Sequence, residues 1–403
     1  MVDFKLTERE EDLKRKAEEF TRKYIIPQAI ELEKKNEYPL DLFQKAYDTG
    51  LMNLHIPKEA GGPGLSLLTE TLVSEATGYG CAGCTTSIMC NNLAFAPLCI
   101  SASIQQLQKY VQPLITGPTV KFGAFSLTER EAGSDAAATK TVAIKEGDGY
   151  KINGIKAFIT NAPHAELFTV FAMTDPDAKP RHRGISCFMV QKKKGVSIGY
   201  IENKCGQLLS EQSEIIFEDV WVPDDCLVGK EGEGFKIAMK TLDNTRAGIA
   251  AIATGVAQRA VDESARFANI RKQFGQPIGR FQAIGFTIAD MACRAAASRH
   301  LTRYAAWLAD QGLPNSKDSA FAKWFASDAA MTNAVEAIQI FGGYGYVKEY
   351  PVEKLMRDAK LLQIYEGTNQ IQRLVASGII LKEWREKTTG FKLNYQGRDS
   401  PQI

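Results

Sequence analysis

The sequence predicts an α+β protein with three successive parts: an N-terminal helical domain, a middle domain of antiparallel strands forming a barrel or sandwich, and a C-terminal helical bundle. Two observations lead to this prediction. Apolar residues recur with a helical period over residues 1–118, alternate between Gly-rich turns over 119–232, and return to a helical period over 233–385. A chain of 403 residues is also long for one hydrophobic core. Segregated runs of helices and strands are typical of the α+β class.

The first part opens with a capping-box pattern, in which Thr7 is followed three residues later by Glu10. Apolar residues then keep a helical spacing at Leu13, Ala17, Phe20 and Tyr24. Pro39 stands where a second helix is expected to begin, and the glycines of residues 61–64 mark a loop. Further helical patterns cover residues 66–80 and 104–114.

The middle part contains a predicted β-hairpin. Residues 140–145 and 150–154 alternate between polar and apolar side chains, and the Gly-rich stretch 146–149 joins them. Further strand candidates are residues 167–172, 185–190 and 214–217. Short strands at regular intervals are typical of a small antiparallel barrel or sandwich.

The third part returns to helix after Gly232 and Gly234. One apolar stripe is formed by Val256, Ala260, Ser264 and Phe267. Further helices are predicted over residues 278–311, 316–341 and 367–384. Frequent alanine permits close helix packing, so we expect an up-down four-helix bundle. Residues 386–403 are polar and are expected to form a loosely packed tail.

The composition excludes several classes of protein. A net charge of +2 gives no indication of binding to nucleic acid or to an anionic membrane. No apolar run reaches the roughly 18 residues that a membrane span needs. Residues 1–5 match neither a signal peptide nor an Arg-rich transit peptide. We therefore expect a cytoplasmic protein, or a protein of the mitochondrial matrix if a transit peptide has been removed.

The chain has eight cysteines and four histidines, which are scattered. Cys81 and Cys84 form a C-x-x-C motif, but no second pair stands at zinc-ligand spacing, so we expect no metal site. We interpret these two cysteines as small buried side chains rather than as redox-active or metal-binding groups. The cysteine usage fits a reducing compartment.

Residues 365–368 contain the main candidate for a catalytic group. Glu366 stands between Tyr365 and Gly367. A carboxylate in an apolar pocket has a raised pKa because burial disfavours its charged form, and it then acts as a base near neutral pH. Glycine permits close approach of the backbone to a ligand. From these residues alone, a solvated glutamate in a loop is an equally good interpretation.

Two segments of the middle part offer groups for a heterocyclic ligand. Residues 125–135 supply hydroxyls and backbone N–H groups that can bind a phosphate or a ring, although a surface turn is the alternative. Phe158 and Thr160 lie on one face of a strand and can stack on and hydrogen-bond to a flat ring. They can equally be ordinary core and rim residues.

Three segments of the third part carry further candidates. Asp243 and Arg246 form either a structural pair or a contact to a polar ligand group. Arg271 is a phosphate candidate beside the turn at Gly275, with a solvated arginine as the alternative. The glycines of residues 339–346 permit close approach of a ligand or a partner chain, but they are not a dinucleotide-binding fingerprint.

Together these segments resemble the acyl-CoA dehydrogenase family along nearly the whole chain, from about residue 4 to residue 384. The motifs occur in the family's order and spacing: Leu-Thr-Glu-x-x-Ala-Gly-Ser-Asp, Ile-Thr-Asn, Arg-Lys-Gln-Phe-Gly, Ile-Phe-Gly-Gly-Tyr-Gly and Ile-Tyr-Glu-Gly-Thr-Asn-Gln-Ile-Gln. The similarity is greatest to medium-chain and bacterial butyryl-CoA dehydrogenases. It implies the family's three-domain fold.

The resemblance implies FAD bound between the β domain and the C-terminal helices. Positions that match flavin contacts are Phe125, Leu127, Thr128, Gly133, Ser134, Phe158, Thr160, Thr368 and Gln370. Positions that match contacts to the FAD of a neighbouring subunit are Arg271, Phe274, Gln339 and Gly343. Each site would therefore need a dimer, and the expected assembly is a homotetramer, a dimer of dimers.

The resemblance also implies oxidation of an acyl-CoA thioester to the trans-2-enoyl-CoA, with electrons passed to an electron-transferring flavoprotein. Glu366 matches the base that removes the α proton while a hydride passes to the flavin. Positions that match or border the acyl-CoA are Met89, Ser134, Asp243, Arg246, Tyr365 and Gly367. Some relatives place the base near residue 246, but residues 246–251 contain no carboxylate here.

Departures from the family leave the acyl group open. Glu129, Arg130 and Glu131 replace the usual Glu-Pro-Gly or Glu-Pro-Asn. Met89 replaces a carboxylate of medium-chain relatives, so the accepted chain length is expected to differ. Cys84 stands where glutaryl-CoA relatives carry an arginine, which disfavours a dicarboxyl substrate unless Arg130 serves instead. Enoyl-CoA reduction of a short or aromatic acid, an acyl-CoA oxidase activity and a non-catalytic flavin or CoA binder are the alternative functions.

Overall fold

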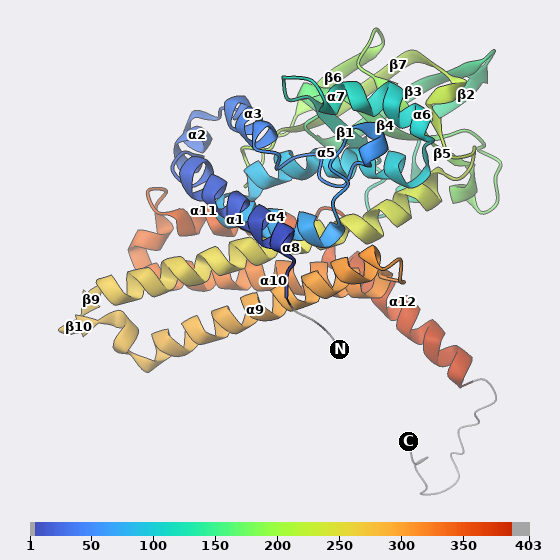
Figure 1. Ribbon diagram of the computed structural model, residues 1–403. Coiled ribbons are helices and arrows are strands. Elements are labelled where there is room, and N and C mark those ends of the chain that lie inside the picture. The colour runs from blue at the N-terminus through green and yellow to red at the C-terminus, as the bar shows by residue number, and fades with distance from the viewer. Residues whose placement is uncertain (1–4, 389–403) are drawn as a thin grey trace, which may run out of the picture.

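The computed structural model describes residues 5–388, and the predicted tail from residue 389 onward lies outside them. The N-terminal helices and the sheet lie together on one side of the molecule (Figure 1). The long C-terminal helices run side by side beneath them as a separate layer. The three predicted parts and the α+β class are thus confirmed.

The N-terminal part is helical, as predicted. Its α-helices are α1 (Glu8–Phe20), α2 (Ala29–Lys35), α3 (Leu40–Asp48), α4 (Leu67–Gly80), α5 (Ala82–Ser101), α6 (Ile104–Gln106) and α7 (Gln112–Ile115), with π-helical turns at Thr21–Ile25 and Leu107–Val111. The capping box is present, because Thr7 Oγ1 accepts from the N–H of Glu10 and the Glu10 carboxylate accepts from the N–H of Thr7 at 2.7 Å. Helix α5 was not predicted, since it is buried nearly all round and so lacks an apolar–polar period.

The middle part forms one eight-stranded sheet. Its strands are β1 (Phe122–Ser126), β2 (Val142–Glu146), β3 (Gly149–Thr160), β4 (Ala165–Met173), β5 (Ile185–Gln191), β6 (Val196–Ile201), β7 (Gln212–Pro223) and β8 (Leu227–Val228). The strand order is β6-β7-β3-β2-β4-β5-β8, with β1 paired to β4. The predicted purely antiparallel pairing is wrong in one respect. Strand β1 runs parallel to β4, and β2 meets β4 in a parallel pair at Val142 and Met173, so the sheet is mixed.

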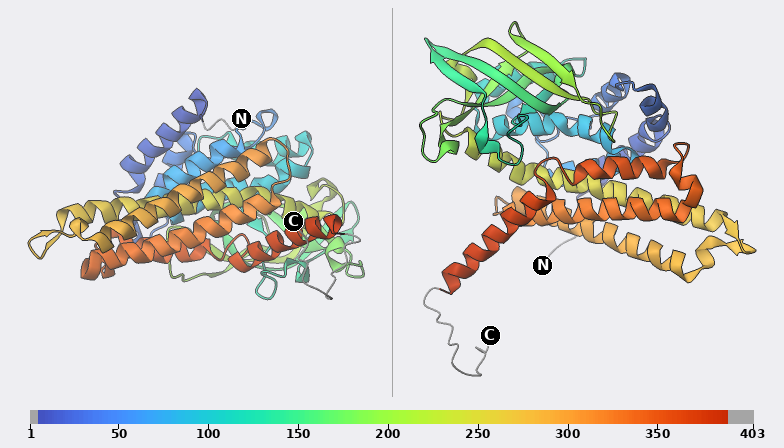
Figure 2. Two further views of the ribbon diagram at one scale, coloured as in Figure 1. Left: turned by 90° about the horizontal axis from the view of Figure 1, so that it is seen from below. Right: turned by 180° about the vertical axis from the view of Figure 1, so that it is seen from behind.

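The C-terminal part is built on three long helices that pack on one another. The elements are α8 (Gly234–Ile270), β9 (Lys272–Gln273), β10 (Gln276–Pro277), α9 (Gln282–Asp310), α10 (Ser316–Phe341), α11 (Pro351–Leu362) and α12 (Asn369–Lys387). Helices α11 and α12 pack against α10, and α12 leaves the bundle at an angle (Figure 2). Helix α4 crosses α8 closely at Gly255, where a Cβ would lie 2.3 Å from the carbonyl oxygen of Glu75. This crossing brings the N-terminal domain onto the bundle.

The buried apolar residues form three clusters, one mainly in the bundle, one mainly among the N-terminal helices, and one that joins the sheet to α5 and to the start of α8. The bundle core is rich in alanine, and α10 buries Ala322, Ala326, Ala330, Ala334 and Ala337 along one face. Small side chains at this spacing allow the helices to approach closely. No helix within residues 5–388 is long and apolar enough to cross a membrane.

Candidate active site

The candidate base, Glu366, lies in the loop that joins α11 to α12. Its backbone is left-handed with φ of 51°, and Gly367 follows with φ of 87°. A residue other than glycine in this region stores roughly 1–3 kcal/mol of strain, so its surroundings must hold it there. Gln372 Nε2 donates to the carbonyl oxygens of Glu366 at 3.2 Å and Gly367 at 2.8 Å. Lys323 Nζ donates to the Gly367 carbonyl oxygen at 2.8 Å. The loop is therefore fixed from two helices.

The Glu366 carboxylate faces α8. Its Oε2 atom accepts a hydrogen bond from Thr245 Oγ1 at 2.8 Å. Burial raises the pKa of Glu366 to about 7, although the Thr245 hydroxyl and the charges of Arg246 and Lys323 oppose the rise. The side chain nevertheless keeps some accessible surface, as expected for a group at the wall of a cleft. A carboxylate with this pKa accepts a proton near neutral pH.

Lys323 is the buried cation beneath this loop. It is fully buried on α10 and also donates to Asn369 Oδ1 at 3.1 Å. Burial lowers the pKa of Lys323 to about 7. The Lys323 side chain thus holds the Gly367 carbonyl oxygen in place beside Glu366, whose pKa is also about 7.

Tyr365, which precedes Glu366, is held by a chain of hydrogen bonds to residues of the N-terminal and β domains. Its hydroxyl lies 3.1 Å from Thr86 Oγ1, which donates to Gln207 Oε1 at 2.8 Å. Gln207 is held in turn by Asp358, whose Oδ1 atom accepts from the Gln207 N–H at 2.5 Å. Burial raises the pKa of Tyr365, so its hydroxyl stays protonated.

The predicted acyl-CoA residues of α8 adjoin this centre. Arg246 Nη1 lies 2.5 Å from Asp243 Oδ1, so these two form the structural pair that was one of the alternatives. Arg246 Nε is buried and has no hydrogen-bond partner within residues 5–388, which leaves one donor for a ligand. Met89 is buried, whereas Ser134 is exposed on a loop of the β domain.

The predicted flavin residues of the β domain gather at β1, β3 and the loop after β1. Phe125 is on β1, and Leu127, Thr128, Gly133 and Ser134 follow it. On β3 a register shift between Lys156 and Ile159 turns Phe158 outward, with φ of 58° and 58 % of its surface exposed. Thr160 accepts from Gln212 Nε2 at 3.2 Å. Ser126 Oγ is buried and has no partner within the described chain. An outward ring on β3 and an unpaired hydroxyl on β1 fit the edge of a heterocycle.

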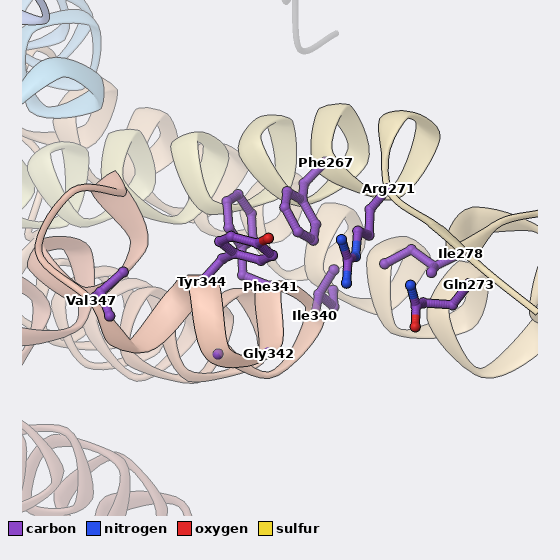
Figure 3. Close-up of a pocket in the computed structure, with 10 residues that line it drawn as sticks. Phe267, Arg271, Gln273, Ile278, Ile340, Phe341, Gly342, Tyr344 and Val347 are labelled. Atoms are coloured by element: carbon purple, nitrogen blue, oxygen red, sulfur yellow. The ribbon is translucent and has the colours of Figure 1, made fainter.

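A second group of predicted flavin residues lies at the far end of the bundle. Arg271 and Gly343 line a hollow of about 640 Å³, where the Arg271 guanidinium lies over the Tyr344 ring at 5.2 Å (Figure 3). Phe274 is 93 % exposed, and Gln339 is also exposed. Residue 271 follows Thr245 by 26 positions along α8, which corresponds to roughly 39 Å. The structure therefore does not bring these four residues to the Glu366 site of the same chain.

Two predicted contacts at the start of α12 have other surroundings. Thr368 is the N-cap of the helix, and its Oγ1 atom accepts from the Ile371 N–H at 3.3 Å. Gln370 is exposed. A capping role accounts for Thr368 without a ligand.

The unusual charged segment after β1 is paired within the β domain. Glu129 is buried against the fully buried Lys156 at 2.8 Å, and the pKa of Glu129 is lowered to about 2 because this ion pair and nearby hydrogen bonds outweigh burial. Arg130 forms an ion pair with Glu214, and Glu131 with Lys140. Arg130 is thus paired within the β domain. No group of three His, Cys, Asp or Glu side chains in the described chain is placed to hold a metal ion.

Thr245 and Lys323 are functional candidates that the sequence analysis missed. Thr245 stood inside the segment from Asp243 to Arg246, but its contact with Glu366 spans 121 positions. Lys323 did leave a signal, because it is a lysine on a face of α10 that is otherwise alanine-rich.

Comparison with known proteins gives consistent matches over the chain. Three family domains match: "Acyl-CoA dehydrogenase, N-terminal domain" over residues 7–118, the middle domain over 124–220 and the C-terminal domain over 232–380. A short-chain-specific acyl-CoA dehydrogenase of Clostridium acetobutylicum is 42% identical over 387 residues, covering 94% of this chain and 100% of the relative. Acryloyl-CoA reductase (NADH) of Anaerotignum propionicum is 41% identical, covering 94% and 96%.

Solved structures agree with these matches. Butyryl-CoA dehydrogenase from Megasphaera elsdenii has a TM-score of 0.91 at 39% identity and covers 94% of this chain and 100% of its own. A chain in a structure described as the electron transferring flavoprotein of Acidaminococcus fermentans has a TM-score of 0.91 at 43% identity, with the same coverage.

Proposed function

Because the chain belongs to the acyl-CoA dehydrogenase family, we propose that it oxidises a short acyl-CoA thioester to the trans-2,3-enoyl-CoA, with FAD as the electron acceptor. Acyl-CoA dehydrogenases are FAD proteins. The observation that carries the proposal is Glu366, a half-buried carboxylate with a pKa of about 7 on a strained, firmly held loop. The short acyl chain is inferred from the Clostridium acetobutylicum and Megasphaera elsdenii relatives.

The chain's own residues account for the proton transfer. Glu366 accepts the α proton of the thioester, and Thr245 orients its carboxylate through the hydrogen bond to Oε2. The N–H of Glu366 donates no hydrogen bond within residues 5–388, so it is free to donate to the thioester carbonyl oxygen. Such a donor stabilises the negative charge that develops as the α proton leaves. When bound, FAD supplies the acceptor for the hydride from the β carbon.

The cofactor would lie along the β-domain residues around Phe158 and Ser126. Phe158 would stack on the ring system and Thr160 would hydrogen-bond to its edge. Arg271, Phe274, Gln339 and Gly343 would reach the FAD of another subunit, because they lie too far from Glu366 to share its cofactor. This arrangement requires at least a dimer, and we propose the homotetramer. The cytoplasmic location stays a prediction.

The reverse reaction is a second candidate. It is favoured by one observation, the acryloyl-CoA reductase of Anaerotignum propionicum at 41% identity. Both directions use the same proton position at Glu366. For the oxidation we propose an electron-transferring flavoprotein as the partner, which the match to the Acidaminococcus fermentans structure supports.

Anaerobic titration of the purified protein tests the proposal. We expect a yellow protein with a flavin spectrum that bleaches when butyryl-CoA is added, with crotonyl-CoA as the product. Absence of bound flavin, or a flavin spectrum that no acyl-CoA bleaches and no enoyl-CoA restores after chemical reduction, would contradict both directions.

A further inference from the structure

A buried carboxylate on α4 acts electrostatically on the proposed base. Glu70 on α4 is 4 % exposed. Burial is the main cause of the raised pKa of Glu366, and the charge of Glu70 adds to it. Neither the family resemblance nor the proposed mechanism gives Glu70 a role.

The position of Glu70 follows from α8. Gly248 comes three residues after Thr245, so the two lie on the same face of α8, about one turn apart. A Cβ built on Gly248 would lie 3.4 Å from Glu70 Oε1, with no other heavy atom within 4 Å apart from the local helix backbone. Gly248 is buried, so this open space is internal. The helix face that positions Glu366 therefore continues across an internal gap to Glu70.

The two carboxylate oxygens of Glu70 have different hydrogen-bond partners. Oε2 lies 3.2 Å from His55 Nδ1. Burial alone lowers the pKa of His55, but contacts with Cys99 and Glu70 raise it to about 10, so His55 is a cation that donates to Oε2. Oε1 accepts no hydrogen bond from any described residue. Oε1 is not among the side-chain oxygens of the described residues that are both fully buried and unpaired, so it reaches accessible space within this buried region. A ligand that supplies a donor to this carboxylate oxygen gains affinity over one that supplies none.

Building on the proposed function, we infer that Glu70 forms the far end of the acyl site and selects thioesters whose acyl chain carries a hydrogen-bond donor at its distal end. The donor is a hydroxyl or a protonated amine. An unsubstituted chain leaves Oε1 unpaired, and a distal carboxylate is repelled by it. Glycine at 248 leaves the room that the distal group needs.

The test compares unsubstituted butanoyl-, pentanoyl- and hexanoyl-CoA with their ω-hydroxy and ω-amino counterparts, using kcat/KM and flavin bleaching. In the wild-type protein we expect one substituted thioester to exceed the unsubstituted chain of equal length. Glu70→Gln keeps the shape, but its amide oxygen will face the His55 cation and its NH2 group will face the gap. The open acceptor thus becomes a donor, and the preference falls about 10- to 100-fold. The two substituted arms distinguish a hydroxyl from an amine.

Two further variants keep the test decisive. Gly248→Val fills the gap without changing the charge, and we expect it to remove the same preference. Glu75→Gln is the matched control on α4, because Glu75 pairs with Arg299 at 2.6 Å, away from Gly248. The preference of this variant for substituted thioesters should equal that of the wild type. Thermal unfolding checks that each variant is folded.

The outcomes separate this inference from the proposed function. An equal loss for all thioesters in Glu70→Gln would show a structural role and overturn the inference, as would a wild-type protein without any preference for substituted chains. Either result leaves butanoyl-CoA oxidation standing in the wild type. A wild-type protein that no thioester reduces would overturn the proposed function together with this inference.

Discussion

The side chains at the two ends of helix α8 differ in whether they find partners within the same chain. Near its N-terminus, Thr245 and Arg246 are buried and hydrogen-bonded within the chain to Glu366 and Asp243. At its C-terminus, Arg271 lines an open hollow and Phe274 exposes 93 % of its surface. A single chain thus completes the part that handles the proton and leaves open the part proposed to hold the cofactor of another subunit.

This difference separates two kinds of effect. Substitutions around Glu366 should change the rate and its pH dependence while the flavin stays bound. Substitutions around Phe274 should change flavin retention and assembly while the pKa of Glu366 stays the same. A substitution that changes both would show that the two ends are coupled.

Replacement of the proposed base, Glu366→Gln, should have the largest effect. A positioned base contributes about 10²- to 10⁴-fold, so kcat with butyryl-CoA should fall by that factor. The amide keeps the size of the side chain, so the flavin spectrum and the binding of enoyl-CoA should persist. In the wild type, kcat/KM should rise through pH about 7 as Glu366 becomes ionised. Normal turnover by this variant would refute the assignment of the base.

Replacement of the buried cation on α10, Lys323→Met, should come next. It removes one of the two donors to the Gly367 carbonyl oxygen and leaves Gln372 Nε2, so it costs roughly 0.5–1.5 kcal/mol of unfolding free energy and loosens the loop. Lys323 also lowers the pKa of Glu366, so its loss should shift the acid limb of the pH–rate profile upward.

Lys323→Gln serves as the matched variant, because it keeps a hydrogen-bond donor and removes the charge. We expect it to shift the acid limb as Lys323→Met does while retaining more of the rate at high pH. Identical profiles for Lys323→Met and the wild type would mean that Lys323 is only a structural residue.

Features that depend on residues close in the sequence were predicted better than contacts between segments that are distant in the sequence. The Thr7–Glu10 capping box and the helix over residues 316–341 depend on neighbours in the chain, and both are present. Helix α5 escaped prediction because it is buried nearly all round. The parallel pairing of β1 with β4 and the hydrogen bond from Thr245 to Glu366 join segments that only the folded chain brings together. Glu366 itself was singled out through the family motif rather than through its four-residue surroundings.

Removal of the hydroxyl that orients the base, Thr245→Val, should have a moderate effect. The hydroxyl stabilises the ionised carboxylate, so its loss should raise the pKa of Glu366 and move the acid limb to higher pH. We expect kcat/KM to fall about tenfold at pH values below the pKa of Glu366 and much less at pH values above it. Thr245→Ser keeps the hydroxyl and should follow the wild-type profile. A uniform fall at every pH would indicate displaced packing instead.

Truncation of the exposed ring at the other end of α8, Phe274→Ala, should have the smallest effect on catalysis. The ring is almost fully exposed in the single chain, so the unfolding free energy of that chain should change by less than about 0.5 kcal/mol. If the ring contacts the cofactor of another subunit, flavin should dissociate severalfold more readily and the oligomer should weaken, while the acid limb stays in place. Flavin release on dilution and the pH–rate profile measure these effects separately. Ile144→Ala on β2, where the side chain is also exposed, is the control for loss of surface apolar area. Unchanged flavin retention in Phe274→Ala would remove the main reason for assigning this end of the bundle to a second subunit's cofactor.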